Sequence, residues 1–124
     1  MNQIEAISTH HIRPEHLNHH LSLYGGNIAD WMCEVAYVAT ARLRRRNDHI
    51  VMSRANELRF LRPLRLGDIL ELRATVDRVG KSSIVLRVEG IEVLSGERSC
   101  TGELVFVTVD DKGHKCPHGI EPLL

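Results

Sequence analysis

The sequence is poor in aromatic residues and has no long apolar run. Only 4% of its 124 residues are Phe, Trp or Tyr, so a hydrophobic core must be built largely from Val, Leu, Ile and Ala. No apolar stretch approaches the roughly 18 residues of a membrane span, and the N-terminal residues lack the basic-then-apolar order of a signal peptide. We therefore expect a cytoplasmic protein that does not cross a membrane.

The sequence also lacks an excess of charge of either sign. Sixteen Lys and Arg balance sixteen Asp and Glu, which removes the global electrostatic reason for binding nucleic acid or an anionic membrane. Cysteine is scarce as well. The three cysteines, Cys33, Cys100 and Cys116, are odd in number, lie far apart and form no C-x-x-C motif. Neither a disulfide framework nor a zinc ribbon is predicted, and the thiols are expected to be reduced.

What is present is typical of one globular domain. The 124 residues are 43% hydrophobic and 26% charged, which predicts a single domain over residues 1–124 with a short tail from about residue 111. A net charge of zero also permits self-association.

The hydrophobic pattern predicts one long helix followed by strands. Apolar residues recur at three- and four-residue steps between Ile28 and Leu43, so we expect a helix of about 18 residues that starts near Gly26. A long helix together with several amphipathic antiparallel strands implies the α+β class, with a curved antiparallel sheet wrapped around one long central helix. Strands are expected over residues 69–79, from 84 after a turn at 80–82, over 101–109 and 49–61, and more weakly over 1–11.

Three segments resemble the hot-dog-fold acyl-CoA thioesterases. The segment from Asn18 to Glu34 is similar to a family signature in which an Asn, a short loop, an aromatic residue and Gly-Gly lead into a helix. Residues 60–68 resemble the family's Phe-x-x-Pro-Val-x-x-Gly-Asp entry to a central strand, and residues 79–83 continue the likeness. The segments follow the family's order over most of residues 13–110. The resemblance implies a hot-dog fold and hydrolysis of an acyl-CoA to a carboxylic acid and free CoA, without a metal or other cofactor.

The resemblance assigns roles to the loop and to the start of the helix. Gly25 and Gly26 lack a Cβ, so their N–H groups, at the positive end of the helix dipole, suit an oxyanion hole for the thioester carbonyl. A simple loop-to-helix turn is the alternative. Asn18 is implied to hold the attacking water or the thioester, whereas a loop Asn that caps its own backbone is the alternative. His20 and Tyr24 of the same segment are implied to contact the substrate.

Cys33 departs from the family pattern. Family members that hydrolyse acyl-CoA usually place an Asp there, as a general base or nucleophile. Catalysis by the Cys33 thiol itself stays open, although a thiol in an apolar helix is most often inert and no His close in the sequence is placed to activate it. Glu34, about 100° further around the helix, and Asp30, one turn earlier, stay open as substitutes. A catalytically weakened acyl-CoA-binding or sensing protein is therefore the alternative function.

The predicted hairpin turn is a candidate site for the phosphates of CoA. Lys81, Ser82 and Ser83 supply a cation and two hydroxyls, and Arg62 is a further candidate. The alternative for each of these residues is that it is an ordinary solvent-exposed polar side chain that binds no ligand.

Other functions fit the sequence less well. No G-x-S-x-G motif supports a serine hydrolase, and the expected helix lacks the His of hot-dog dehydratases. No metal site is predicted, because the adjacent His19 and His20 cannot easily ligate one ion together. Leu21 replaces the glycine usual in that loop.

The expected edge strands imply a dimer with a site shared between subunits, and trimers of such dimers are frequent in the family.

Overall fold

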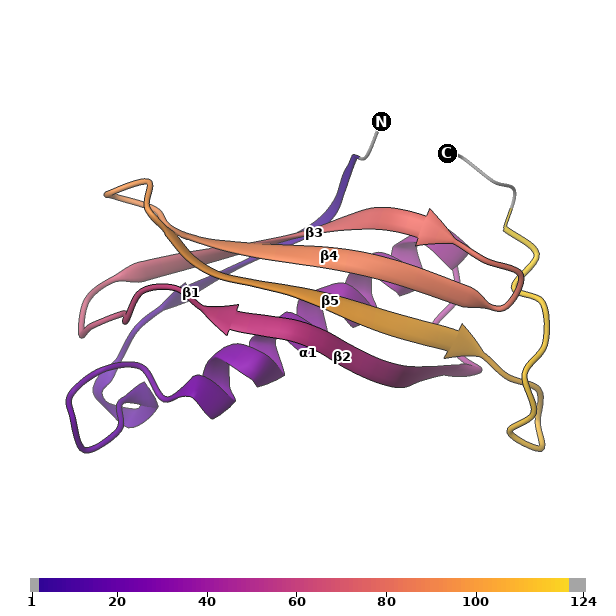
Figure 1. Ribbon diagram of the computed structural model, residues 1–124, viewed down its shortest axis with the longest axis horizontal. Coiled ribbons are helices and arrows are strands. Elements are labelled where there is room, and N and C mark those ends of the chain that lie inside the picture. The colour runs from indigo at the N-terminus through magenta and orange to yellow at the C-terminus, as the bar shows by residue number, and fades with distance from the viewer. Residues whose placement is uncertain (1–2, 121–124) are drawn as a thin grey trace.

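The computed structural model describes residues 3–120, in which one long helix lies against a five-stranded sheet (Figure 1). This is the predicted α+β arrangement. Residues 1–2 of the expected first strand and residues 121–124 of the expected tail lie outside the described residues. The elements are β1 (Ile4–His11), the 3-10 turn η1 (Pro14–His16), α1 (Gly25–Arg44), β2 (Ile50–Phe60), β3 (Ile69–Val79), β4 (Ser83–Glu92) and β5 (Arg98–Thr108).

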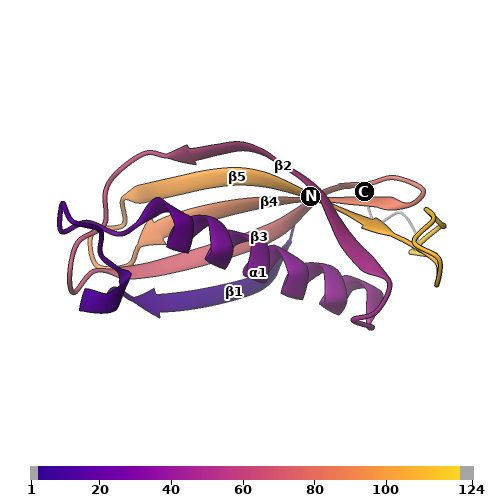
Figure 2. The same ribbon diagram turned by 90° about the horizontal axis from the view of Figure 1, so that it is seen from below.

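The sheet has the strand order β1-β3-β4-β5-β2, and all neighbours are antiparallel. The two strands at its edges, β1 and β2, are the ones that precede and follow the helix in the chain. Figure 2 shows the sheet curving around α1, which packs on β1, β3, β4 and β5. Each predicted strand is confirmed to within a few residues, as expected from the period-two pattern.

The edge strand β2 is unusually exposed for an apolar strand. Ile50, Asn56 and Leu58 are half-buried, and the other residues of β2 are exposed. The register shifts twice along its pairing with β5, and Glu57 adopts a positive φ of 52° at the second shift. One edge of β2 pairs with β5, so its other edge is open to a further strand.

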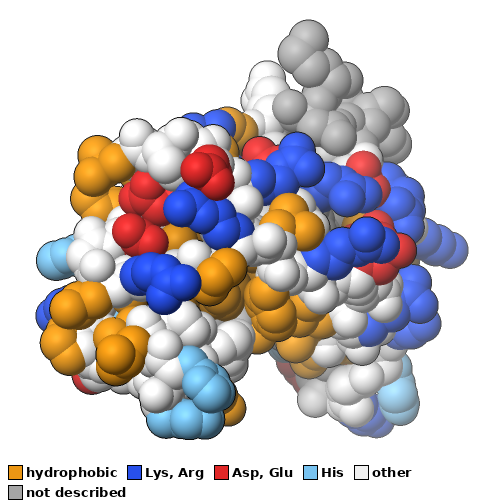
Figure 3. All heavy atoms as spheres, turned by 60° about the vertical axis from the view of Figure 1, so that its left-hand side comes forward, with side chains coloured by type: hydrophobic (Ala, Val, Ile, Leu, Met, Phe, Trp, Pro, Cys, Tyr) orange, Lys and Arg blue, Asp and Glu red, His pale blue; other side chains and the backbone are white. Residues whose placement is uncertain are grey.

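The end of the molecule at which α1 begins also exposes apolar side chains. Figure 3 turns this end toward the viewer, and hydrophobic groups reach the surface between charged ones. The exposed large hydrophobic residues of its loops and turns are Leu21, Tyr24, Phe60, Leu61, Leu66 and Leu94.

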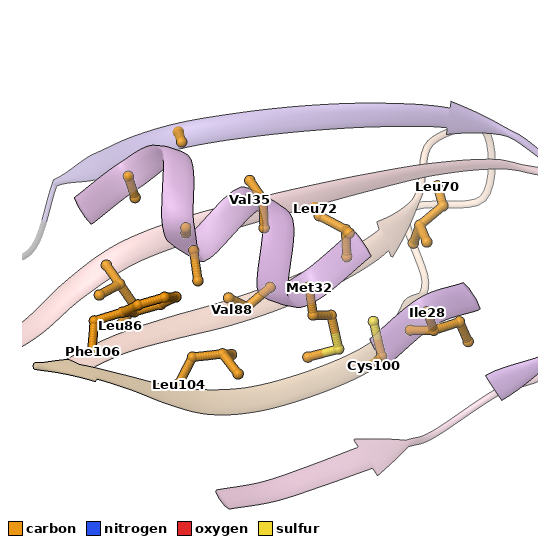
Figure 4. Close-up of a cluster of buried hydrophobic side chains, with 14 of the residues drawn as sticks. Ile28, Met32, Val35, Leu70, Leu72, Leu86, Val88, Cys100, Leu104 and Phe106 are labelled. Carbon is orange, nitrogen blue, oxygen red and sulfur yellow. The ribbon is translucent and has the colours of Figure 1, made fainter. Parts of the chain in front are cut away.

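The helix forms because one stripe of its surface is apolar. It begins one residue earlier than predicted and has 20 residues. Its C-cap, Arg45, adopts the left-handed conformation with φ 61°, which ends the helix. Figure 4 shows its buried face meeting apolar side chains of the sheet. The stripe consists of Ile28, Met32, Val35, Ala36 and Ala39, and it packs with Leu70, Leu72, Leu86, Val88, Leu104 and Phe106.

A glycine in β5 lets the helix approach the sheet closely. A Cβ on Gly102 would lie 2.5 Å from the Leu58 side chain and 2.7 Å from the end of Met32. The neighbouring Cys100 is fully buried, and burial raises the pKa of its thiol to about 11. Cys100 is therefore a core residue without thiolate chemistry at neutral pH.

After β5 the chain folds back onto the β3–β4 hairpin. Val109 and Lys115 form an isolated antiparallel bridge. The Cys116 N–H donates to the Thr108 carbonyl at 3.0 Å, and the His118 N–H donates to the Lys81 carbonyl at 3.2 Å. Part of the expected tail is thus held against the turn predicted to bind phosphate.

Candidate active site

The loop before the helix is organised by Asn18. The Asn18 Oδ1 accepts hydrogen bonds from the N–H groups of His20 (2.8 Å) and Ser22 (3.3 Å), and the Asn18 N–H donates to the Ser22 carbonyl at 2.8 Å. The side-chain oxygen therefore caps its own loop, which is one of the two predicted roles. Within residues 3–120 the Asn18 Nδ2 donates to no partner, so the amide retains a donor for a ligand.

Leu21 keeps this loop in a conformation that suits glycine. Its φ is 63°, in the left-handed region that side chains with a Cβ disfavour. The Leu21 N–H donates to the Asn18 carbonyl at 3.0 Å. A leucine thus occupies a backbone conformation that glycine adopts without strain, and it carries the conformational strain.

Two backbone N–H groups are left without acceptors at the start of α1. The N-cap residue Tyr24 makes no side-chain capping bond, and its carbonyl accepts from Asn27 (2.9 Å) and Ile28 (3.4 Å). Across the described part of the chain, no hydrogen bond uses the N–H of Gly25 or Gly26. Unpaired first-turn N–H groups at the positive end of a helix suit a carbonyl that becomes an oxyanion.

Two aromatic rings flank these glycines. A Cβ on Gly26 would collide with the ring of Tyr24, and a Cβ on Gly25 would lie 3.6 Å from the ring of Phe60. Gly26 is therefore required by the packing of Tyr24. Both rings are exposed, so the two glycines lie next to aromatic side chains at the surface.

Cys33 lies further along α1, beside the free edge of the sheet. Burial raises the pKa of its thiol, and the negative charge of Asp30 raises it further. At neutral pH the thiol is thus a poor nucleophile and a poor base. Asp30, Cys33 and Glu34 line one cavity of about 380 Å³, so the three catalytic alternatives share a site. Its other walls are Tyr37, Ile50, Met52 and Phe106.

The predicted phosphate turn lies at the opposite end of α1. Figure 1 shows the β3–β4 hairpin beside the end of the helix, far from its start. A helix of 20 residues is about 30 Å long. The structure therefore does not bring Lys81, Ser82 and Ser83 together with the two glycines within one subunit.

Comparison with known proteins identifies the family. The model of the family described as "Thioesterase superfamily" matches residues 20–92 of this chain. The chain belongs to the thioesterase superfamily. The protein named "Uncharacterized acyl-CoA thioester hydrolase YkhA" of Bacillus subtilis (strain 168) is 30% identical over 117 residues, which cover 91% of this chain and 67% of that protein.

Solved structures of other thioesterases have the same fold. Acyl-CoA hydrolase from Bacillus cereus matches with a TM-score of 0.80 at 27% identity, over 90% of this chain and 70% of its own. The hexameric thioesterase y2039 from Yersinia pestis matches with a TM-score of 0.81 at 23% identity, over 91% of this chain and 93% of its own, a similarity of fold alone. The predicted hot-dog fold and the resemblance to acyl-CoA thioesterases are confirmed, and the same comparisons support a hydrolase acting on thioester bonds.

The hairpin turn of this thioesterase shares a cavity with the tail. The cavity, of about 240 Å³, is lined by Lys81, Ser82, Lys115, Cys116 and Pro117. No salt bridge found within residues 3–120 includes a lysine. Two lysines, neither of which is in a salt bridge among the described residues, therefore line one cavity. Sequence reasoning missed Lys115, because nothing local to residue 115 signals that the tail folds back.

The remaining predicted site residues lie near the start of the helix or on its neighbouring turns. Arg62 Nη1 contacts Glu97 Oε2 at 3.0 Å and donates to Ser95 Oγ at 3.3 Å, so Arg62 holds the β4–β5 turn and lies apart from Lys81. His20 is exposed on the Asn18 loop.

Two further classes of feature are absent from the described part of this thioesterase. No group of three or more His, Cys, Asp or Glu side chains within residues 3–120 is placed to hold a metal ion. The same residues include no helix with the length and apolarity needed to cross a membrane.

Proposed function

We propose that this chain hydrolyses the thioester of an acyl-CoA with water and releases a carboxylic acid and free CoA. The observation that carries the proposal is the pair of unpaired N–H groups at Gly25 and Gly26, next to a loop in which the Asn18 amide keeps a free donor. Membership of the thioesterase superfamily supports this chemistry.

The thioester carbonyl oxygen accepts from the Gly26 N–H in the proposed complex. Water adds to the carbonyl carbon, and the negative charge that develops on the oxygen is stabilised by about 3 kcal/mol for each preorganised donor. The carbon–sulfur bond then breaks, and the departing CoA sulfur takes up a proton. The Asn18 Nδ2 holds the water or the carbonyl, while Gly25, Tyr24 and His20 contact the substrate.

The proton of the attacking water needs a base. Asp30 and Glu34 are the carboxylates in the cavity beside the helix, and either accepts the proton in our proposal. Cys33 does not, because the raised pKa of its thiol leaves little thiolate at neutral pH. Loss of the base that an aspartate would supply at residue 33 would leave a weakened enzyme or an acyl-CoA sensor, and that is the second candidate function.

We infer a dimer in which the β2 strands of two copies pair. β2 is an exposed edge strand, and a two-fold antiparallel pairing would place the start of one α1 beside the end of its partner's. The partner's Lys81, Ser82 and Ser83, with the partner's Lys115, then bind the CoA phosphates. Light scattering tests this, since a mass of 14.0 kDa at micromolar concentration would exclude the shared site. A trimer of such dimers is the larger assembly we propose.

Two further expectations stay part of this proposal. Residues 1–124 form one domain. The three cysteines are free thiols, as a reducing compartment would keep them, and we propose that the protein is cytoplasmic.

The sharpest test of the proposed reaction is the variant Asn18→Asp. Aspartate keeps the side-chain oxygen that binds the His20 and Ser22 N–H groups, but it replaces the free Nδ2 donor with an acceptor. We expect kcat/KM for acyl-CoA substrates to fall by about 10²- to 10³-fold with little change in melting temperature. Ser22→Ala is the matched control, because it removes only a 3.4 Å contact to Asn18 Oδ1. Tight binding of acyl-CoA by the wild-type protein without turnover would favour the sensor instead.

A further inference from the structure

Three aromatic rings from three elements meet beside the start of α1. The ring of His10, on β1, stacks on Trp31 of α1 with centroids 4.1 Å apart and planes inclined by 8°. The ring of His16, in η1, stands edge-on to the same indole with centroids 5.1 Å apart at 87°. Trp31 therefore contacts two histidine rings, one stacked and one T-shaped, in geometries that aromatic pairs favour.

His16 also joins this stack to the first turn of the helix. Its carbonyl accepts from the Tyr24 N–H at 3.0 Å and from Asn27 Nδ2 at 3.0 Å. Its Nδ1 accepts from the Arg13 N–H at 3.0 Å. One residue thus links η1 to the helix start through its backbone and to Trp31 through its ring.

The Asn18 loop begins two residues after His16. Its stem is closed by an isolated bridge between Leu17 and Leu23, and the Leu23 N–H donates to the Leu64 carbonyl at 2.7 Å. The anchor on the η1 side is His16, so the place of Asn18 relative to Gly26 depends on where that residue is held.

We propose that the stack of His10, Trp31 and His16 is a positioning device, which fixes the Asn18 amide relative to the Gly26 N–H. The inference rests on the proposed function, since these are the two groups assigned to the thioester carbonyl and the water. None of the three rings touches substrate in this arrangement. Displacement of a reacting group by about 1 Å can lower a rate by about 10²-fold, so loss of the stack is expected to affect turnover more than binding of the CoA moiety.

The charges around His10 add a pH dependence. Burial lowers its pKa from 6.5, Glu34 on α1 opposes that change, and the nearby His16 lowers the pKa further. His11 and Arg13 line the same cavity. The Nε2 of His10 lies 3.0 Å from Ser8 Oγ. Because the folded-state pKa is lowered, the neutral ring stabilises the stack at high pH, and that contribution is lost as pH falls through the pKa.

The test compares three single variants with the wild type. His10→Phe keeps a flat ring on Trp31, His10→Ala removes the ring, and His11→Ala alters the adjacent histidine, which does not take part in the stack. For His10→Ala we expect kcat to fall about tenfold to a hundredfold, with KM within about twofold. His10→Phe should recover at least half of the wild-type kcat, and His11→Ala should leave both constants unchanged.

Two readouts do not depend on turnover. Trp31 is the only tryptophan, so its fluorescence reports the stack directly. The wild-type signal should change as pH falls below 6.5, and this change should be smaller in His10→Phe. A ketone analogue of acyl-CoA, with a methylene between sulfur and carbonyl, measures the carbonyl site by calorimetry. His10→Ala should lower the affinity for the analogue at least fivefold more than it lowers the affinity for free CoA.

The outcomes separate the positioning role from the proposed reaction. In one outcome, the wild type hydrolyses no acyl-CoA but binds the ketone more tightly than free CoA, and His10→Ala removes this preference. That result would overturn the proposed reaction and leave the positioning role. Wild-type turnover combined with unchanged kcat and analogue affinity in His10→Ala would overturn the positioning role alone. A loss in His10→Phe equal to that in His10→Ala would also overturn it, because the imidazole itself, rather than ring packing, would then be needed.

Discussion

Replacement of Leu21 by glycine should stabilise the protein, although it removes a large apolar side chain. Leu21 has a φ of 63°, and the left-handed conformation costs a residue with a Cβ roughly 1–2 kcal/mol. Glycine does not carry that strain, but it makes the unfolded chain more flexible, which lowers the stability of the fold by about 0.5–1 kcal/mol. The Leu21 side chain is 70% exposed, so little burial is lost. The net expectation is a gain of about 0.5–1 kcal/mol, or about 2–4 °C in melting temperature for a chain of this size.

The matched control is the same substitution at Leu94. That residue is 80% exposed and is not among the residues with positive φ, so Leu94→Gly should destabilise by about 0.5–1 kcal/mol. Calorimetry of the two variants at equal protein concentration gives the comparison. If Leu21→Gly is destabilised as much as Leu94→Gly, the left-handed loop carries no strain and the assignment is refuted.

Three further predictions concern the site and its support. Cys33→Asp should raise thioester hydrolysis by at most the factor of about 10² to 10⁴ that a general base contributes, while Cys33→Ala changes it little; an acyl adduct at Cys33 in mass spectra during turnover would contradict this. Lys115→Ala should raise KM for acyl-CoA severalfold but leave that for a short pantetheine thioester unchanged, and Lys112→Ala, in the same tail, is the control. Glu92 accepts from two backbone N–H groups, which lower its pKa to about 2. Its stabilisation is therefore complete above pH 4.5 and lost toward pH 2. The gap in melting temperature between the wild type and Glu92→Gln should close over that range, and a constant gap would refute the assignment.

Local pattern was enough to predict most of the fold. Alternation of apolar and polar residues gave the limits of β3, Ile69–Val79, to the residue, because both the core face and the period of a strand are encoded locally. The helix start followed from Gly25 and Gly26 for the same reason. β2 was predicted over 49–61 and spans Ile50–Phe60, although it buries little surface in one subunit.

The site was predictable only where its parts are close in the chain. Asn18 and the two glycines are eight residues apart at most, and one motif contains them. Lys115 lies beside Lys81 because the tail folds back onto the β3–β4 hairpin, and no periodicity in the sequence predicts that contact. The stack of His10 on Trp31 likewise depends on how β1 passes the helix. The left-handed conformation of Leu21 could not be predicted, because leucine, unlike glycine, does not indicate a positive φ.

Because α1 separates the helix start from the lysine pair within one subunit, two different defective variants are expected to complement each other. If the helix start and the lysine pair of each site come from different subunits, a site fails when either of its two donors is defective. Mixing an Asn18→Asp protein with one that carries Lys81→Ala and Lys115→Ala produces mixed dimers in which one site inherits both defects and the other inherits neither. Random exchange of subunits between equal amounts of the two variants would restore about a quarter of all sites. Two impaired preparations would therefore become active when they are combined.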